Sequence, residues 1–198
     1  MKILLIDNNT EHKKALARAL AGHDVEVQRY TPGVRFNYQD KDLVLLTGGG
    51  GEGHEIDDKH SPGRLWYEDE MKFIQVCNKP VIGICMGFEI IANTFGAKVD
   101  EMKKEVRGVK RLRTTKAGRE YFKKDNLRQY EAHKWRVKEL PEQLVPLAYS
   151  NDEVYAFKHR ERPLYAFQFH PEVEKGVDGK AIFDNFVDKV VKPRIGVS

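Results

Sequence analysis

Short apolar runs separated by segments with helical spacing constrain the fold of this chain more than any other feature. Lys2–Ile6, Leu43–Leu46 and Val81–Ile84 are each four or five residues long, and each leads into a turn or a glycine-bearing segment. Continuous apolar runs of this length are typical of strands buried on both faces of a parallel sheet. The chain is therefore expected to be an α/β protein in which helices connect parallel strands.

The segments between these runs predict the helices. Asn8, followed three residues later by Glu11, has the form of a capping box, after which apolar residues recur at helical spacing as far as Gly22. Three further helical patterns cover residues 65–76, 88–95 and 180–191.

After residue 97 the pattern changes to short alternating segments. These predict antiparallel strands near residues 106–112, 145–149, 154–157 and 164–169. Such strands either extend the parallel core or flank it.

Length and composition bound the organisation and the compartment. The 198 residues, 40% of them hydrophobic, are expected to form one domain over residues 1–198 that needs neither disulfides nor metal. No apolar run approaches the roughly 20 residues of a membrane-spanning helix, and the start of the chain has too few apolar residues before Asp7 for a signal peptide. Cys77 and Cys85 do not make a disulfide framework, so we expect a cytoplasmic protein without a membrane partner.

The net charge of +4 is unevenly distributed. Between Lys103 and Lys124, ten lysine and arginine residues stand against Glu105 and Glu120, a net charge of +8. This segment is either a solvated, twisted hairpin with charged outer faces or a surface that meets nucleic acid, a phosphorylated ligand or an acidic partner protein. Neither aromatic interleaving nor zinc spacing supports a nucleic-acid module, so no nucleic-acid partner is expected.

The sharpest chemical motif is Gly83-Ile84-Cys85-Met86-Gly87, between an apolar strand and a helical segment. It has the form of a nucleophile elbow with cysteine in place of serine, in which small flanking residues make room for a tight strand-to-helix turn. Such a turn exposes the sulfur at a helix N-terminus, where the helix dipole and backbone N–H groups favour the thiolate. The alternative is a small buried hydrophobic side chain, which is the role expected for Cys77.

A second motif follows the last predicted strand and reads Gln168-Phe169-His170-Pro171-Glu172-Val173. A cysteine nucleophile needs a base that takes its proton and returns it to the leaving group, and the base needs an acceptor that orients it. His170 and Glu172 have the chemistry for these two roles, and Pro171 would hold them in a fixed relation. The alternative is a surface His and Glu in a turn.

The third motif is glycine-rich and follows the buried run Leu43–Leu46. Residues Gly48–Gly51 leave backbone N–H groups free to face a ligand, as an oxyanion hole or a phosphate cradle requires. The Lys-Ser/Thr pair of a P-loop is missing, which makes nucleotide phosphate the weaker choice, and a flexible loop is the alternative.

Each of the three motifs follows a predicted strand, and ligands of α/β proteins bind at the carboxyl ends of the strands. In this order and placement the motifs resemble those of class I glutamine amidotransferases. Further short segments are similar to the same family: Ala132-His133, Leu140-Pro141, Ala148–Asn151, Ala156, His159 and Asn185-Phe186.

The resemblance implies a three-layer α/β/α fold with a mainly parallel central sheet and a smaller antiparallel sheet. It implies Cys85 as the nucleophile, His170 as the base and Glu172 as its partner. The oxyanion donors would be the N–H groups of Met86 and of Gly49 or Gly50, and the expected substrate-binding residues are Glu89, Gly87 and His133. The chemistry implied is a γ-glutamyl thioester from glutamine, with ammonia released to a separate synthetase chain and no cofactor.

One departure from the family pattern concerns the substrate. Many amidotransferases have His-Gln after the elbow, whereas this chain has Phe88-Glu89, which is similar to γ-glutamyl hydrolases. A carboxylate at Glu89 would suit the α-ammonium of a substrate and repel its α-carboxylate, unless Glu89 is only a solvated helix residue. The downstream segments resemble the amidotransferase subunits of GMP synthase and anthranilate synthase. Glutamine is therefore the first expectation, and a γ-glutamyl hydrolase acting alone is the second.

Two other features leave alternatives open. The segment His54–His60 has metal-competent side chains without a zinc or calcium spacing, so no metal is expected and a polar loop beside the active site is preferred. A function of a different class is a catalytically silent module that binds a partner through the basic segment Lys103–Lys124.

Overall fold

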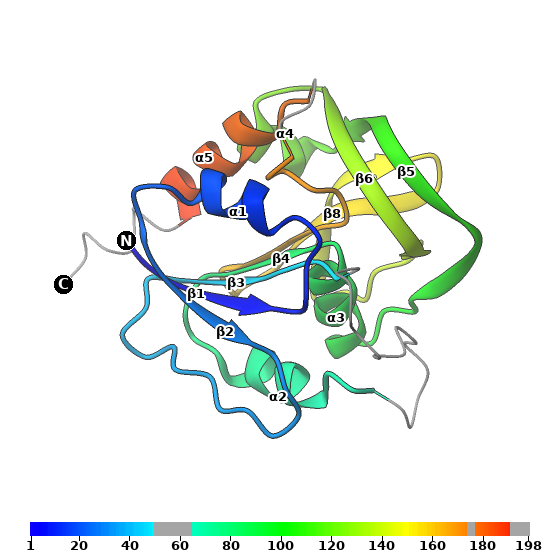
Figure 1. The fold of residues 1–198 in the computed structure, drawn as a ribbon. Helices are drawn as coiled ribbons and strands as arrows, with labels where there is room; N and C mark the ends of the chain where they lie inside the picture. The colour runs from blue at the N-terminus through cyan, green and yellow to red at the C-terminus, as the bar shows by residue number, and fades with distance from the viewer. Residues whose placement is uncertain (50–64, 174–176, 191–198) are drawn as a thin grey trace.

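The structure is a computed structural model that describes residues 1–49, 65–173 and 177–190. Within these residues, nine strands form one sheet in the order β2-β1-β3-β4-β9-β8-β7-β5-β6 (Figure 1). The parallel part contains β1 (Lys2–Asp7), β2 (Asp24–Arg29), β3 (Leu43–Leu46), β4 (Val81–Ile84) and β9 (Leu164–Phe167). The antiparallel part contains β5 (Asp100–Thr114), β6 (Asn126–Arg136), β7 (Leu144–Ser150) and β8 (Glu153–His159).

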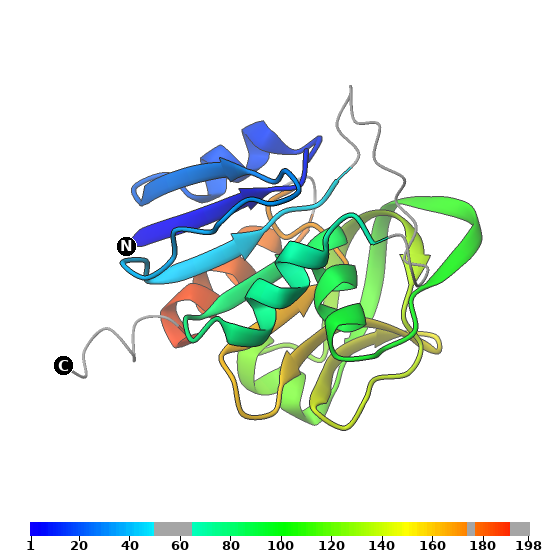
Figure 2. The same cartoon turned by 90° about the horizontal axis from the view of Figure 1, so that it is seen from below.

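Helices cover both faces of the parallel part. The helices α1 (Lys13–Ala19) and α5 (Gly179–Val190) lie on one face, and α2 (Glu68–Val76) and α3 (Met86–Thr94) lie on the other (Figures 1 and 2). The helix α4 (Lys116–Phe122) lies beside α5 and packs against β7. Successive side chains of a strand point to opposite faces, so Ile3 and Leu5 pack with the first group while Leu4 and Ile6 pack with the second. The α/β class with three layers is confirmed.

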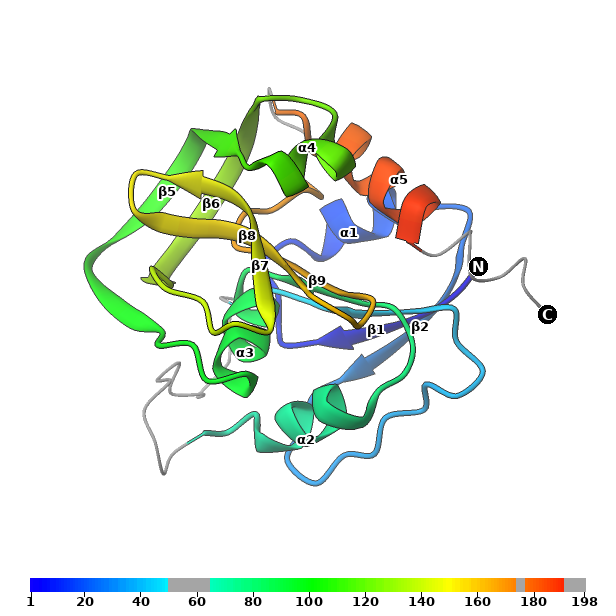
Figure 3. The ribbon, with the colours of Figure 1, turned by 180° about the vertical axis from the view of Figure 1, so that it is seen from behind.

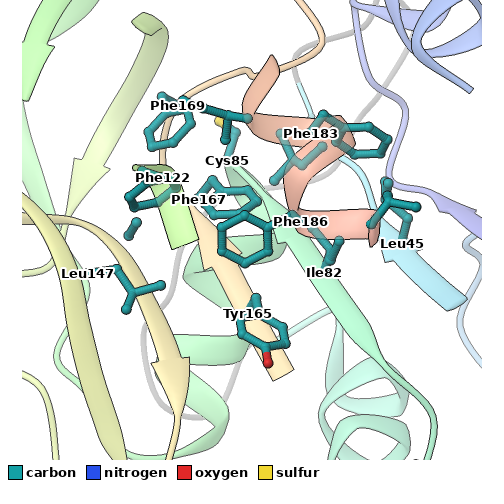
Figure 4. Close-up of a cluster of buried hydrophobic side chains, with 14 of the residues drawn as sticks. Leu45, Ile82, Cys85, Phe122, Leu147, Tyr165, Phe167, Phe169, Phe183 and Phe186 are labelled. Atoms are coloured by element: carbon teal, nitrogen blue, oxygen red, sulfur yellow. The ribbon is translucent and has the colours of Figure 1, made fainter. Parts of the chain in front are cut away.

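Aromatic side chains hold α5 against the centre of the sheet. Phe186 contacts Phe167 edge-on, with ring centroids 4.8 Å apart, and Tyr165 with centroids 5.2 Å apart. Edge-to-face pairs of this kind add to the free energy gained from burying the rings. Cys85 belongs to the same buried cluster and lies at its margin (Figure 4). The nucleophile candidate therefore stands on a closely packed support.

The antiparallel strands extend the parallel strands in the same sheet. The family resemblance implied a smaller antiparallel sheet beside the parallel one. Instead, β8 pairs with β9 through Ala156, Phe157 and Lys158, so the antiparallel strands continue the same mixed sheet. The assignment of residues 164–169 to the antiparallel group was wrong in part. The strand β9 pairs parallel with β4 on its other side, so it is the point at which the sheet changes direction.

The first helix begins later than its predicted cap. Helix α1 starts at Lys13 with His12 as N-cap, and Asn8 makes no capping bond. The backbone N–H of Asn8 donates to Thr47 Oγ1 at 2.9 Å, and Asn9 has a left-handed φ of 61°. The chain therefore turns before the helix can form, and Asn8 serves the neighbouring loop instead.

The basic segment is only partly the hairpin that its charge pattern favoured. Residues up to Thr114 belong to the long strand β5, whereas the remainder forms the short helix α4. The partner strand β6 was not predicted at all. Its inward positions carry the polar residues Gln129, Glu131 and His133, so the alternation of apolar and polar residues that marks a half-buried strand is missing.

None of the helices within the described residues is long and apolar enough to cross a membrane.

Candidate active site

Cys85 occupies a strained turn between β4 and α3. Its backbone dihedral angles are φ 50° and ψ −102°, a conformation that non-glycine residues rarely adopt and that is typical of functional turns. A Cβ atom on Gly83 would lie 2.5 Å from the carbonyl oxygen of Gly87, and one on Gly87 would lie 2.7 Å from that of Leu46. Both glycines are therefore required by the close approach of the backbone.

His170 and Glu172 follow β9 and form a buried pair. Nδ1 of His170 lies 2.8 Å from Oε1 of Glu172, and the two residues are 2% and 1% exposed. Burial lowers the pKa of His170, but Glu172 and the Cys85 thiolate outweigh it, so that the pKa is raised well above its ordinary value. The imidazolium is thus the favoured form when the thiolate is present.

Two influences act in opposite directions on the pKa of the Cys85 thiol. Burial raises its pKa, and the adjacent His170 lowers it only in part. The sulfur also donates a hydrogen bond to the carbonyl oxygen of Ala132 on β6, at 3.6 Å. The helix N-terminus alone therefore does not produce a free thiolate, and charge separation at Cys85 depends on proton transfer to His170.

The glycine-rich loop after β3 lies directly against this pair. A Cβ atom on Gly48 would be 3.1 Å from Cε1 of His170 and 3.3 Å from Cβ of Cys85. Because β3, β4 and β9 are adjacent in the sheet, their carboxyl ends bring the three sequence motifs to one place.

The two described oxyanion candidates are neighbours. A Cβ atom on Gly49 would approach Cε of Met86 to 2.8 Å, and both residues line the same cavity as Cys85. Gly50 lies outside the described residues. The loop is held by the N–H of Glu11, which donates to the carbonyl oxygen of Gly49 at 3.3 Å.

A cavity of about 390 Å³ adjoins the sulfur of Cys85. This volume suits a small-molecule ligand. Its wall contains both signs of charge, from the carboxylates of Glu11, Glu89, Glu101 and Glu105 and from the cations Arg107 and Lys134. The cavity is thus equipped for a small zwitterion such as an amino acid.

Glu89 is a buried residue of this cavity, so its interpretation as a solvated helix residue was wrong. It is 2% exposed, and its Oε1 accepts a hydrogen bond from Nε2 of Gln168 at 2.8 Å. Gly87 is not among the residues that line the cavity, and Leu46 fills the space beside it. This close contact with Leu46 supports the turn.

His133 lines the cavity and belongs to a polar network on β6. Its Nδ1 lies 2.7 Å from the carbonyl oxygen of Trp135 and its Nε2 lies 3.2 Å from Oε2 of Glu131. These two contacts hold the imidazole of His133 in place against β6. Burial opposes ionisation of Glu131, but His133 and Tyr155 outweigh it, and the pKa of Glu131 is lowered.

Two buried or partly buried residues near the site, His12 and Glu70, were not singled out from the sequence. The imidazole of His12 packs against His170, and the fully buried Glu70 accepts a hydrogen bond from Nδ2 of Asn8 at 3.4 Å. The only signal for His12 was its place just before a helix, which did not distinguish it from a surface residue. Glu70 lay in an acidic stretch that has the pattern of a solvated helix face.

No group of three or more His, Cys, Asp or Glu side chains within the described part of the chain is arranged to hold a metal ion. The segment His54–His60, which was expected to form a polar loop beside the active site, lies outside the described residues.

The sequence model of the family described as glutamine amidotransferase class-I matches residues 4–190. The chain belongs to this family. The matched range of this class I glutamine amidotransferase contains all three motifs: the elbow, the glycine loop and the His170–Glu172 pair.

Curated relatives and solved structures agree with the assignment. The glutamine-hydrolyzing GMP synthase subunit of Methanothermobacter thermautotrophicus is 29% identical over 198 residues, which cover 94% of this chain and 96% of the relative. The corresponding protein of Thermoplasma volcanium is 32% identical over 190 residues, which cover 94% of this chain and 91% of the relative. The crystal structure of a GMP synthase subunit from Thermoplasma acidophilum superposes with a TM-score of 0.82 at 27% identity, covering 98% of this chain and 96% of that one. A glutamine amidotransferase from Thermotoga maritima, at 20% identity, shares the fold with a TM-score of 0.70 and covers 98% of this chain and 86% of that one.

Proposed function

We propose that this amidotransferase hydrolyses the side-chain amide of glutamine and supplies the ammonia to a separate synthetase chain of the GMP synthase type. One observation carries the proposal: Cys85, His170 and the Gly48–Gly49 loop converge at the ends of three adjacent strands, beside a cavity of about 390 Å³. The names of the relatives with matching length support glutamine as the substrate and a separate chain as the ammonia acceptor.

The proposed chemistry has two stages. His170 takes the proton of Cys85, the thiolate attacks the amide carbon, and the proton is returned to the leaving nitrogen, so that ammonia departs and a γ-glutamyl thioester remains. His170 then activates a water that attacks the thioester and releases glutamate. Glu172 fixes the imidazole through the Nδ1 bond and stabilises its positive charge, and the N–H groups of Met86 and Gly49 stabilise the oxyanion.

Glu89 and His133 are the proposed substrate-binding side chains. Glu89 lies at the cavity wall, where its carboxylate would accept from the α-ammonium of the substrate. His133 lines the wall formed by β6, from which its imidazole would contact the α-carboxylate. We assign Gly87 to the turn, as its contact with Leu46 supports.

The second candidate is a γ-glutamyl hydrolase that acts alone. The buried Glu89–Gln168 pair favours it, because this carboxylate stands where many amidotransferases have glutamine. For either activity we propose that residues 1–198 act as one catalytic domain in the cytoplasm, without a cofactor.

Glutamate release tests the two activities against each other. Purified protein is assayed on glutamine and on γ-glutamyl p-nitroanilide, with and without the synthetase chain of GMP synthase from the same source. Hydrolysis of glutamine that rises with the synthetase supports the amidotransferase, whereas rapid hydrolysis of the anilide by the protein alone supports the hydrolase.

Two cysteine variants test whether Cys85 is the nucleophile. Cys85→Ala is expected to lower either activity by about three orders of magnitude or more, while Cys77→Ala keeps it, because Cys77 is buried at the end of α2 away from the cavity. Diazo-oxo-norleucine should label Cys85 in the wild type and in Cys77→Ala, and it should leave Cys85→Ala unlabelled. The silent partner-binding module is the correct interpretation if the wild type is as inactive as Cys85→Ala on both substrates and is also not labelled.

A further inference from the structure

The outward face of the β5–β6 ribbon carries arginine residues around an apolar centre. On this face Arg111 pairs with Arg128 across the strands, Arg113 pairs with Asn126, and Val109 pairs with Tyr130. The three arginines are exposed, and Val109 is 47% exposed. We call Arg111, Arg113, Arg128 and Val109 the arginine face. Figures 1 and 3 show the two strands side by side at the edge of the molecule.

The arginine face is electrostatically unbalanced. Like charges directly opposite one another in an antiparallel pair are destabilising, which is the relation of Arg111 to Arg128. Farther along the same face, Arg107 does have a carboxylate partner, Glu11, at 2.9 Å. Asp178 lies near Arg128, whose backbone N–H donates to Asp178 Oδ2 at 2.9 Å, but within the described residues neither Arg111 nor Arg113 has an acidic side chain at ion-pair distance. An acidic surface placed on this face would relieve the repulsion.

The same ribbon touches both candidate catalytic residues. On β6, the carbonyl oxygen of Tyr130 accepts a hydrogen bond from the N–H of His170 at 2.8 Å, and that of Ala132 accepts from the sulfur of Cys85 at 3.6 Å. Arg107, on β5, lines the cavity. A partner bound to the arginine face would therefore contact a strand whose backbone holds the nucleophile and the base.

From these observations we infer that the arginine face docks an acidic surface of the synthetase chain, and that docking changes the rate of glutamine hydrolysis through β6. The inference rests on the proposed function for the identity of the partner. A protein partner is favoured over a nucleic acid because the exposed Val109 gives the centre of the face an apolar contact, as in protein interfaces, where arginine is also enriched. Complementary charge supplies the orientation.

Charge reversal on the face tests the inference. The variant Arg111→Glu/Arg113→Glu/Arg128→Glu is compared with Lys14→Glu/Arg18→Glu/Lys72→Glu, which makes the same change in net charge at exposed positions of α1 and α2. Binding of the purified synthetase chain is measured by calorimetry at two salt concentrations. We expect the face variant to bind at least about tenfold more weakly and to lose the salt dependence, and the control to bind like the wild type.

Activity supplies the second readout. Glutamine hydrolysis by the face variant alone should equal that of the wild type, because none of its three positions lines the cavity, whereas the change of rate on adding the synthetase should be lost. Should the triple variant not fold, Arg111→Gln/Arg128→Gln removes the opposed charges with less disturbance and is expected to weaken binding in the same direction.

Three outcomes would overturn the inference. In the first, the face variant and the control bind the synthetase equally well. In the second, the wild type does not bind the synthetase. In the third, the face variant no longer binds a 20-nucleotide RNA but still binds the synthetase. The proposed function is tested separately. It requires that the wild type, alone or with the synthetase, hydrolyses glutamine and is labelled at Cys85, and the binding results of the variants do not affect this requirement.

Discussion

The imidazole of His12 packs against the imidazole of His170, with ring centroids 4.3 Å apart and planes inclined by 67°. His12 is the N-cap of α1, and its Nε2 lies 3.3 Å from Oε1 of Glu11. Burial and the adjacent His170 lower the pKa of His12, while Glu172 and Glu11 act in the opposite direction and Arg107 lowers it further. A second imidazole in its neutral form thus stands beside the proposed base.

Replacing His12 by phenylalanine should make stability less sensitive to acid. In the wild type the unfolded chain takes up a proton near pH 6.5, whereas the folded chain resists it, so the free energy of unfolding falls as the pH drops below 6.5. The His12→Phe variant lacks this loss, which is about 1.4 kcal/mol for each unit by which the pKa is lowered. Urea denaturation at pH 7.5 and 5.5 measures the difference, and equal pH dependence of the two proteins would contradict it.

Glu172→Gln should slow hydrolysis without unfolding the protein. The neutral amide no longer stabilises the imidazolium of His170, so kcat should fall by about 10²- to 10⁴-fold with little change in KM. The pKa of His170 should also fall, because Glu172 is the group that raises it most, and the pH–rate profile would report this shift. The exposed Glu139→Gln serves as the control, and a variant of full activity would remove Glu172 from the proposed triad.

Gly83→Ala should destabilise the turn that carries Cys85. The added methyl group would lie 2.5 Å from the carbonyl oxygen of Gly87 and 2.6 Å from Cδ1 of Ile91, so backbone has to move. We expect a loss of about 3 kcal/mol in the free energy of unfolding, measured by urea denaturation. Gly22→Ala, which meets no atom within 4 Å but has φ +88°, should cost only about 1 kcal/mol. Equal losses for both variants would refute the steric argument.

Glu70→Gln should stabilise the protein at alkaline pH. Burial raises the pKa of Glu70 to about 8, so the folded chain keeps a proton that the unfolded chain loses above pH 4.5. The wild type therefore loses stability as the pH rises from 4.5 to 8, and the variant does not. Its new amide can also donate to Oδ1 of Asn8, which has no hydrogen-bond partner among the described residues.

Denaturation at pH 5 and pH 8 measures the effect. The gain in the free energy of unfolding of Glu70→Gln over the wild type should be roughly 3 kcal/mol larger at pH 8 than at pH 5. The exposed Glu68→Gln on the same helix should show no such difference. A Glu70→Gln variant that is less stable than the wild type at pH 8 would show that the carboxylate is ionised and paired in the folded protein.

Local patterns were sufficient for the central parallel strands β3 and β4. Leu43–Leu46 and Val81–Ile84 are apolar throughout because both faces of their strands are covered, and this produces a signal that needs no tertiary information. The strand β6 gave no such signal, because its inward residues Glu131 and His133 are polar and satisfy each other. Their burial is decided by a network between strands that are distant in sequence.

The sequence by itself determined the strand-to-helix turn at Cys85 and the motifs that follow β3 and β9, since each depends on residues within one short segment. Only the tertiary structure decided that His12 stands beside His170, that Ala132 accepts from Cys85, and that Glu89 is buried against Gln168. The physical reason is distance along the chain. These contacts join residues 47 to 158 positions apart, and they depend on which strands become neighbours in the sheet.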